Sequence, residues 1–260
     1  MPEFLQDPKV LEQLEILRQS LPMGIWETIY SSVLSTVLAY VIGLPLGVIL
    51  VVGEKGGIRP LPGPLMKVLN FIINILRSVP FLILMIMVIP LSRLILGTRV
   101  GTMALVVPLV IAAAPFVARL VEGSLREMDR GVIEAAQAMG CTPFQIIRKV
   151  LLPECLPSLL TGFTTAFITI LSYGAMAGVI GGGGLGAIAI NYGYYRTKTL
   201  VMYVAVILLV ILVQILQSAG THMAVRKDKR INNGGRKQAA SGAKKKIDRN
   251  KKMPSGRSPM

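Results

Sequence analysis

The chain has 260 residues, of which 53% are hydrophobic and only 16% are charged, whereas a soluble domain carries about 25% charged residues. Its mean hydropathy is +0.63 and several apolar runs reach about 20 residues, which excludes an ordinary soluble domain and indicates a membrane protein. The formal net charge of +15 is concentrated, because 13 of the 28 basic residues lie in residues 226–260. This excess predicts a basic tail and no nucleic-acid-binding domain.

Residues 1–22 are predicted to form an amphipathic helix. The apolar residues that share one helical face are Val10, Leu11, Leu14, Leu17 and Leu21. Charged residues interrupt this pattern, so the helix cannot cross a membrane and is expected to lie in its interface. The segment has no basic start and no small-residue cleavage site, so it is not expected to be a signal peptide.

Residues 23–225 are expected to form an all-α membrane domain with five transmembrane helices. The five apolar stretches long enough to cross are Trp26–Val52, Leu65–Ile89, Val100–Val121, Leu156–Ile180 and Leu200–Gly220. Glycines four residues apart, such as Gly43 and Gly47, allow two helix backbones to approach closely. Prolines inside the spans are tolerated because neighbouring groups can satisfy the freed carbonyls.

The basic residues predict how the spans are oriented. With the tail in the cytoplasm, the segments on that side carry 21 Lys and Arg residues and those outside carry six. Positive charge resists translocation, so the N-terminus is expected outside and the C-terminus inside. The tail, residues 226–260, is rich in Gly, Ser, Asn and Lys and is expected to be disordered and solvated, with contact to anionic lipid headgroups as the alternative.

Three residues inside the spans are candidates for the lining of a pathway. Arg77 is costly within an apolar span, so it either faces a pathway or bonds carbonyls freed around Pro80. Met176 stands alone among small residues and is either a hydrophobic gate or ordinary core packing, and Ser172 supplies a polar group nearby. The glycine run Gly181–Gly186 favours a re-entrant turn at the outer mouth.

The cytoplasmic segment 129–157 is predicted to contain two short helices. Asp129 can cap the first helix, and Gly140 can end it in the left-handed conformation. Thr142 and Gln145 have capping-box spacing at the start of the second helix, which Pro153 is expected to end together with Pro157. Its apolar residues are Ile133, Met139, Phe144, Ile147 and Leu151. These apolar side chains are expected to be buried, either against a partner protein or against the chain's own spans.

The spacing in this segment resembles the EAA loop of ABC importer permeases. The matching positions are Glu134, Ala135, Ala136 and Gly140, followed by Val150 to Pro153 with Val150 where the family pattern has Ile. In that family the loop forms a coupling helix that sits in a cleft of a separate ATPase subunit. The resemblance therefore implies that these residues are the positions of ATPase docking.

Three further runs are similar to permeases of the methionine uptake family, namely Arg77–Phe81, Gly178–Gly186 and Asn191–Tyr194. The resemblance covers residues 26–220 and implies the type I importer plan in a bacterial inner membrane. It also implies a homodimer, two ATP-binding subunits and an extracytoplasmic substrate-binding protein, with methionine as the preferred cargo.

The chain is not expected to be an enzyme. It lacks the G-x-x-x-x-G-K-[ST] motif that cradles ATP phosphates, so ATP and Mg are expected on a partner subunit and no cofactor on this chain. Two cysteines and one histidine are too few for a metal cluster. One alternative to a methionine permease is an importer permease of the same plan with another cargo, such as another amino acid or a phosphonate. The other alternative is an ATPase-independent secondary transporter. Such a transporter usually holds its coupling ions with acidic residues inside the membrane, and the predicted spans contain no Asp or Glu other than Glu27.

Overall fold

The computed structural model describes residues 7–227 of the chain. Every regular element in this part is helical, as the apolar runs predict. Four of its helices are long and apolar enough to cross a membrane, and a bent helix pair supplies a fifth crossing if it counts as one span. Residues 1–6 and the tail from residue 228 onward, the region expected to be disordered, lie outside the described residues.

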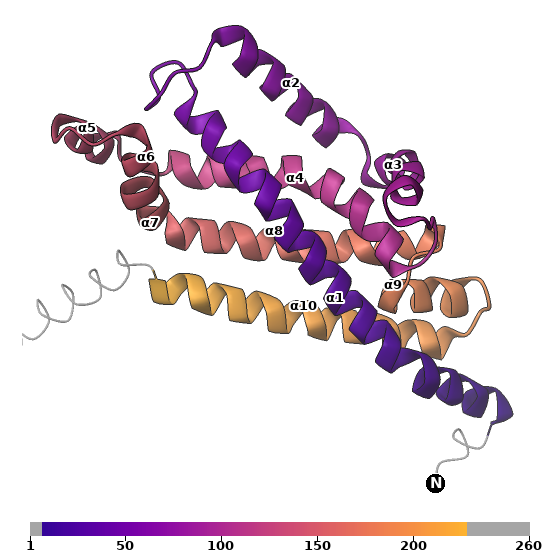
Figure 1. Cartoon of the computed structure of the whole chain (residues 1–260). Coiled ribbons are helices and arrows are strands. Elements are labelled where there is room, and N and C mark those ends of the chain that lie inside the picture. Colours follow the sequence, from indigo (N-terminus) through magenta and orange to yellow (C-terminus); the bar gives the residue numbers. More distant parts are fainter. Residues whose placement is uncertain (1–6, 228–260) are drawn as a thin grey trace, which may run out of the picture.

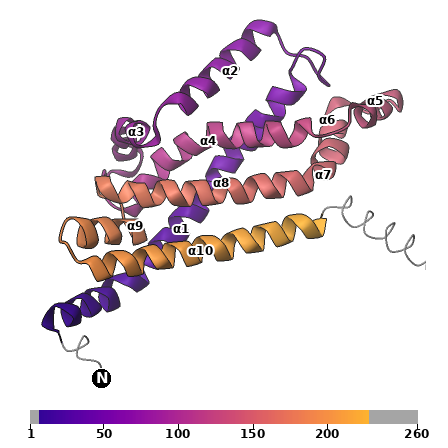
Figure 2. The same ribbon diagram turned by 180° about the vertical axis from the view of Figure 1, so that it is seen from behind.

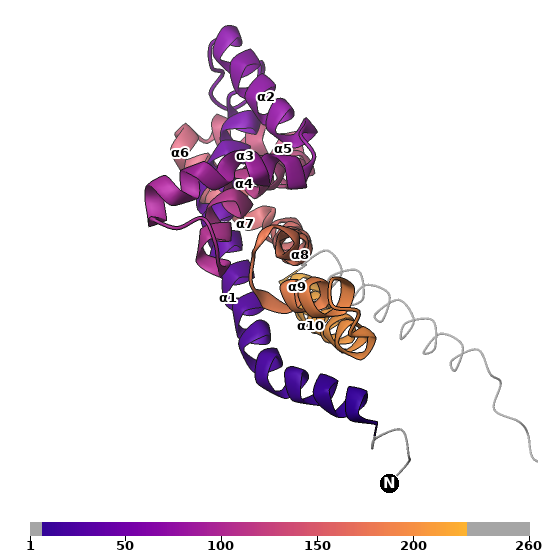
Figure 3. The same ribbon diagram turned by 90° about the vertical axis from the view of Figure 1, so that its right-hand side faces the viewer.

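The first helix, α1, runs from Pro8 to Val52 without interruption (Figure 1). At about 1.5 Å per residue its 45 residues extend about 67 Å, far more than the roughly 30 Å hydrocarbon core of a bilayer. The structure therefore differs from the expectation of a separate N-terminal helix, because Pro22 lies inside α1 and does not end it. The N-terminal turns curve away from the rest of α1 (Figure 3). Their position in the membrane interface stays a prediction.

The N-terminal turns of α1 are bound to the start of the last helix, α10 (Thr199–Lys227). The side-chain oxygen of Gln13 accepts a hydrogen bond of 3.0 Å from the backbone N–H of Leu200, and Lys198 forms an ion pair with Glu12. These contacts satisfy polar groups at a helix start.

The second expected span is broken. Helix α2 (Gly63–Ser78) and helix α3 (Phe81–Leu96) meet at an angle of 107°. The expectation of one continuous helix over Leu65–Ile89 was therefore wrong. Pro80 has no N–H to donate, and it holds the preceding residue, Val79, in an extended conformation with φ −76° and ψ 128°.

The centre of the bundle is the packing of α1 on α4 (Thr102–Arg126). A Cβ atom on Gly43 would lie 2.6 Å from a side-chain atom of Val117, and one on Gly47 would lie 2.6 Å from Val121. The two backbones are therefore close enough that only glycine fits, as the four-residue spacing predicts. Figures 1 and 2 show α1 crossing α4, α8 (Leu156–Met176) and α10, which run side by side.

The glycine run after α8 forms a tight turn at one end of the bundle. The backbone turns at Gly181, where φ is +86°, and returns as α9 (Gly184–Ile188), which a π-helix extends to Tyr194. The Glu27 carboxylate of α1 accepts a 2.7 Å hydrogen bond from the Gly184 N–H, and the Thr28 hydroxyl accepts one of 2.8 Å from the Leu185 N–H. Two side chains of α1 therefore hold the start of α9.

The loops gather at two opposite ends of the bundle (Figure 1). One end holds the C-terminal end of α1, the start of α2, the short helices α5–α7 and the C-terminal end of α10. The other end holds α3, α9 and the N-terminal turns of α1. The segment with the EAA-like pattern therefore lies at the same end as the other segments rich in basic residues.

Candidate functional site

The two-helix segment forms as the local sequence predicts. Helix α5 (Arg130–Ala138) starts at Asp129, whose Oδ1 accepts a 2.8 Å hydrogen bond from the Gly131 N–H. Gly140 follows α5 with φ +77°, in the left-handed region that glycine favours. Helix α6 (Pro143–Ile146) begins with the complete capping box between Thr142 and Gln145.

The end of the segment differs from the expectation. Helix α6 continues as a π-helix, η2 (Ile147–Leu151), and then as α7 (Leu152–Glu154). Pro153 lies in the first turn of α7, so the expectation that Pro153 ends the second helix was wrong. The wider π-turn accommodates a proline, because it interrupts the regular hydrogen-bond ladder in which a proline N–H would be missing. Pro157 lies in the first turn of α8.

The apolar residues of the segment divide into a buried and an exposed set. Ile133 and Ile147 pack against the core cluster under α4 and α8, in which Leu151 is fully buried. Met139 and Phe144 are 77% and 68% exposed. The chain's own spans therefore cover the base of the segment and leave this pair uncovered; we call Met139 and Phe144 the apolar tip.

The EAA-like residues lie in the same segment as this tip. Ala136 is buried, whereas Glu134, Ala135, Gly140 and Pro153 are exposed. Glu134 lines a cleft of about 230 Å³ between α5 and the turn after α1. Within residues 7–227 its carboxylate has no ion-pair partner. An exposed carboxylate in the same segment as an uncovered apolar tip is suited to contact with another protein.

A stripe of hydroxyl groups follows one face of α8 and ends at Met176. Ser172 lies on this face together with Thr161, Thr165 and Thr169, and its role in a pathway stays a prediction. Each hydroxyl donates to a backbone carbonyl of the preceding turn at 2.8–3.2 Å, so its lone pairs remain available as acceptors. Met176 is 52% exposed and is not part of the packed core of the single chain.

Arg77 does not join this stripe. It lies in the last turn of α2 with an exposed side chain, and it forms no hydrogen bond with the residues that the structure describes. Beyond the Pro80 bend, Phe81 stacks on Tyr173 of α8 at a centroid distance of 4.0 Å. The bend therefore packs against α8 one turn from Met176, while the role of Arg77 stays a prediction.

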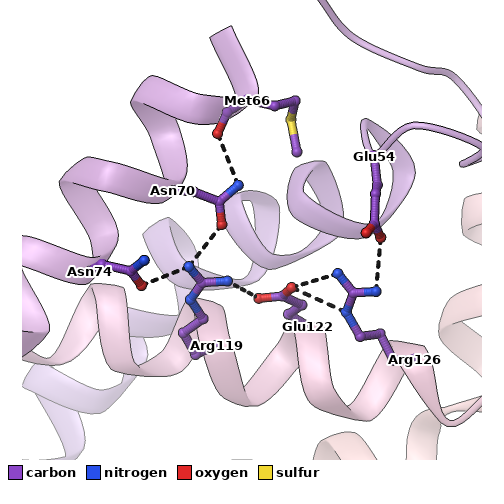
Figure 4. Close-up of polar contacts among 7 residues, drawn as sticks. All are labelled: Glu54, Met66, Asn70, Asn74, Arg119, Glu122 and Arg126. Carbon is purple, nitrogen blue, oxygen red and sulfur yellow. Dashed lines mark hydrogen bonds and ion pairs between the residues drawn. The ribbon is translucent and has the colours of Figure 1, made fainter. Parts of the chain in front are cut away.

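A buried polar network connects α2, α4 and the turn after α1 (Figure 4). Glu122 is only 8% exposed and accepts hydrogen bonds from Arg119 at 2.6 Å and from Arg126 at 2.9 Å. Glu122 is therefore a shielded carboxylate that two arginines share. The spacing of Arg119, Glu122 and Arg126 along one helix indicates ion pairs. The partners of Arg119 on α2 are too distant in the sequence to be inferred.

The comparisons with known proteins agree with this fold. Residues 43–222 match the family described as binding-protein-dependent transport system inner membrane component. The chain belongs to this family. It is therefore a multi-pass component of an inner-membrane transport system and not an enzyme.

Two curated relatives of this permease are named as methionine transport permeases. A probable D-methionine transport system permease protein MetI from Vibrio cholerae is 50% identical over 205 residues, which cover 79% of this chain and 91% of that protein. The D-methionine transport system permease protein MetI from Escherichia coli K12 is 48% identical over 158 residues, which cover 61% of this chain and 72% of that protein.

Solved structures support the same fold. One crystal form of the inward-facing MetNI methionine ABC transporter matches with a TM-score of 0.80 and 45% identity, covering 83% of this permease and 99% of that chain. A second form matches with a TM-score of 0.78 and 46% identity, covering 80% and 95%. The likeness to an amino acid ABC transporter, with a TM-score of 0.65, is 20% identical and supports the fold alone.

Proposed function

We propose that this permease forms, as a homodimer, the pathway of an ATP-driven importer for methionine. The observation that carries the proposal is the likeness to the MetNI methionine ABC transporter at 45% identity over 99% of that chain. A relative of comparable identity and coverage is named a D-methionine permease. A permease of the same plan with another amino acid or a phosphonate as cargo is the alternative.

The ATPase is proposed to bind at the apolar tip. Met139 and Phe144 are largely exposed, and Glu134, five residues before Met139, has no ion-pair partner among the described residues. Exposed apolar groups next to a charge are typical of a binding surface for another protein. In this proposal two ATP-binding subunits bind two copies of the tip, and ATP and Mg belong to those subunits.

The pathway is proposed to run between the α8 stripes of two permease chains. The exposed hydroxyls from Thr161 to Ser172 can accept hydrogen bonds from the cargo's ammonium group or from water. Met176 from each copy would close the pathway at one end, because two flexible apolar side chains exclude water from a narrow passage. Movement of the two bundles as rigid bodies would then open one end at a time.

An extracytoplasmic substrate-binding protein is proposed to deliver cargo at the end that carries α3 and α9. The excess of basic residues at the opposite end supports a cytoplasmic location for α5–α7 and the C-terminus, and an outer location for the N-terminus. A secondary transporter is disfavoured, because Glu27 of α1 and Glu122 of α4 are already hydrogen-bonded.

Uptake of labelled methionine into proteoliposomes tests the proposal. The vesicles contain this permease, its ATPase subunit and its binding protein, with ATP supplied on the ATPase side. ATP-dependent accumulation that unlabelled methionine competes away, and other amino acids do not, is the expected result. ATP-dependent uptake of a different solute would refute methionine as the cargo and would leave the importer mechanism in place. Uptake that is independent of ATP and of both partners would refute the importer.

A further inference from the structure

Helix α2 is attached to the bundle by one apolar cluster, in which Ile73 packs with Leu50 and Ala118, and by polar contacts with α4. Of its 16 residues, all of which the structure describes, only Ile73 is buried. The apolar side chains of Leu65, Phe71 and Ile75 are 47–64% exposed. The guanidinium group of Arg119 on α4 donates to the side-chain oxygens of Asn70 and Asn74, both at 2.8 Å. Arg119 therefore holds two successive turns of α2.

The same arginine is connected to the end of α4 through Glu122. One carboxylate oxygen of Glu122 accepts from Arg119 at 2.6 Å, and the other accepts from Arg126 at 2.9 Å. Arg126 also pairs with Glu54 in the turn after α1 at 2.8 Å. Figure 4 shows these side chains in one row, with Glu122 between the two arginines. We call this set, together with Asn70 and Asn74, the Glu122 network.

The Glu122 network is contiguous with the proposed ATPase-binding segment. Arg126 is the last residue of α4, and Asp129, which caps α5, follows three positions later. Glu54 and Arg126 also line the cleft of about 230 Å³ that contains Glu134. A displacement of α5 can therefore act on the end of α4 and on Arg126.

The network has a firm part and an exchangeable part. The side chains of Arg119 and Glu122 are 20% and 11% exposed, and separating a shielded pair leaves an uncompensated charge. The side chains of Arg126 and Glu54 are 45% and 46% exposed, and exposed pairs contribute little to stability. A cavity of about 420 Å³ beside them is also lined by Lys55, a second cation available to either carboxylate. The outer pair can therefore change partners while Arg119 stays on Glu122.

We propose that Arg119 and Glu122 are positioning residues for transport. They transmit the movement of the ATPase-binding segment to α2, whose bent junction with α3 packs against α8 near Met176. The inference rests on the proposed function, since it needs an ATPase that moves the segment. A network with two partner arrangements is the physical requirement for such transmission. A static brace would stabilise the fold and would leave the ratio of transport to hydrolysis unchanged.

The most specific test removes the contact with α2 and leaves the ion pairs intact. In the complete complex, the double variant Asn70→Ala/Asn74→Ala is expected to hydrolyse ATP at the wild-type rate or faster. The methionine imported per ATP hydrolysed is expected to fall about fivefold, within the range that network residues modulate coupling. The variant Asn70→Ala/Asn74→Asp restores an acceptor for Arg119 and is expected to recover most of the ratio.

A second variant acts at the centre of the network. Glu122→Gln removes the charge that both arginines share and is expected to lower the same ratio. Glu127→Gln is the matched control, because Glu127 is exposed at the end of the same helix and is expected to leave the ratio unchanged. If Glu122→Gln does not assemble, the asparagine variants decide alone.

The two possible failures are distinguishable. A wild-type ratio in Asn70→Ala/Asn74→Ala would overturn the positioning role and leave the importer untouched. Wild-type complex without ATP-dependent methionine uptake would instead overturn the proposed function on which the inference rests.

Discussion

Truncation of the apolar tip gives the sharpest prediction about the ATPase interface. Phe144 is 68% exposed in the single chain, and a phenylalanine buries roughly 150–250 Å² when fully covered. About 100–170 Å² of its surface is therefore available to a partner, and at about 25 cal/mol per Å² its complete burial contributes roughly 2.5–4 kcal/mol. An alanine retains part of this area, so Phe144→Ala is expected to cost about 2 kcal/mol, or roughly 30-fold in Kd per site.

Binding of purified permease in detergent to immobilised ATPase subunit measures this loss. Tyr194→Ala is the matched control, because Tyr194 is a similarly exposed aromatic residue, 72% accessible, at the opposite end of the bundle. It is expected to leave ATPase binding unchanged. The thermal stability of Phe144→Ala should also stay at the wild-type value, since the side chain lies outside the core. A Kd within twofold of wild type in Phe144→Ala would refute the location of the interface.

Three further predictions follow from the described contacts. Glu134→Lys is expected to insert and fold, because no described side chain pairs with the carboxylate. It is also expected to lower ATP-dependent uptake at least tenfold, because placing like charges opposite each other at the ATPase interface costs several kcal/mol. Normal uptake by this variant would contradict the role of Glu134. Met176→Ala is expected to raise ATP-independent leakage of methionine from loaded vesicles. An unchanged leak would contradict the role of Met176 as a gate. Gly47→Val places a Cβ 2.6 Å from Val121, so the melting temperature in detergent is expected to fall by roughly 5 °C; an unchanged value would contradict the close approach of α1 and α4.

The local features of the permease were predictable from the sequence. Apolar runs predict membrane helices because lipid requires every backbone group to bond within its own segment. The caps at Asp129 and at Thr142 with Gln145 form as expected, since each cap joins residues only two or three positions apart. Gly140 adopts the left-handed conformation for the same local reason. The glycines at positions 43 and 47 indicated the close packing of α1, although their partner helix could not be inferred.

The tertiary structure decided the features that depend on distant partners. Pro80 permits a bend between α2 and α3, and the angle of that bend is 107°. The bent junction packs on α8 through the stacking of Phe81 on Tyr173, which lies 92 positions away in the sequence. The burial of Glu122 could not be inferred from the sequence, because its place in the network depends on how α1 and α2 pack against α4. Pro153 was read as a helix end, although a proline also fits inside a helix where a π-turn accommodates the missing N–H. The sequence therefore determined which segments are helical and how their ends are capped, and packing decided which polar groups became buried together.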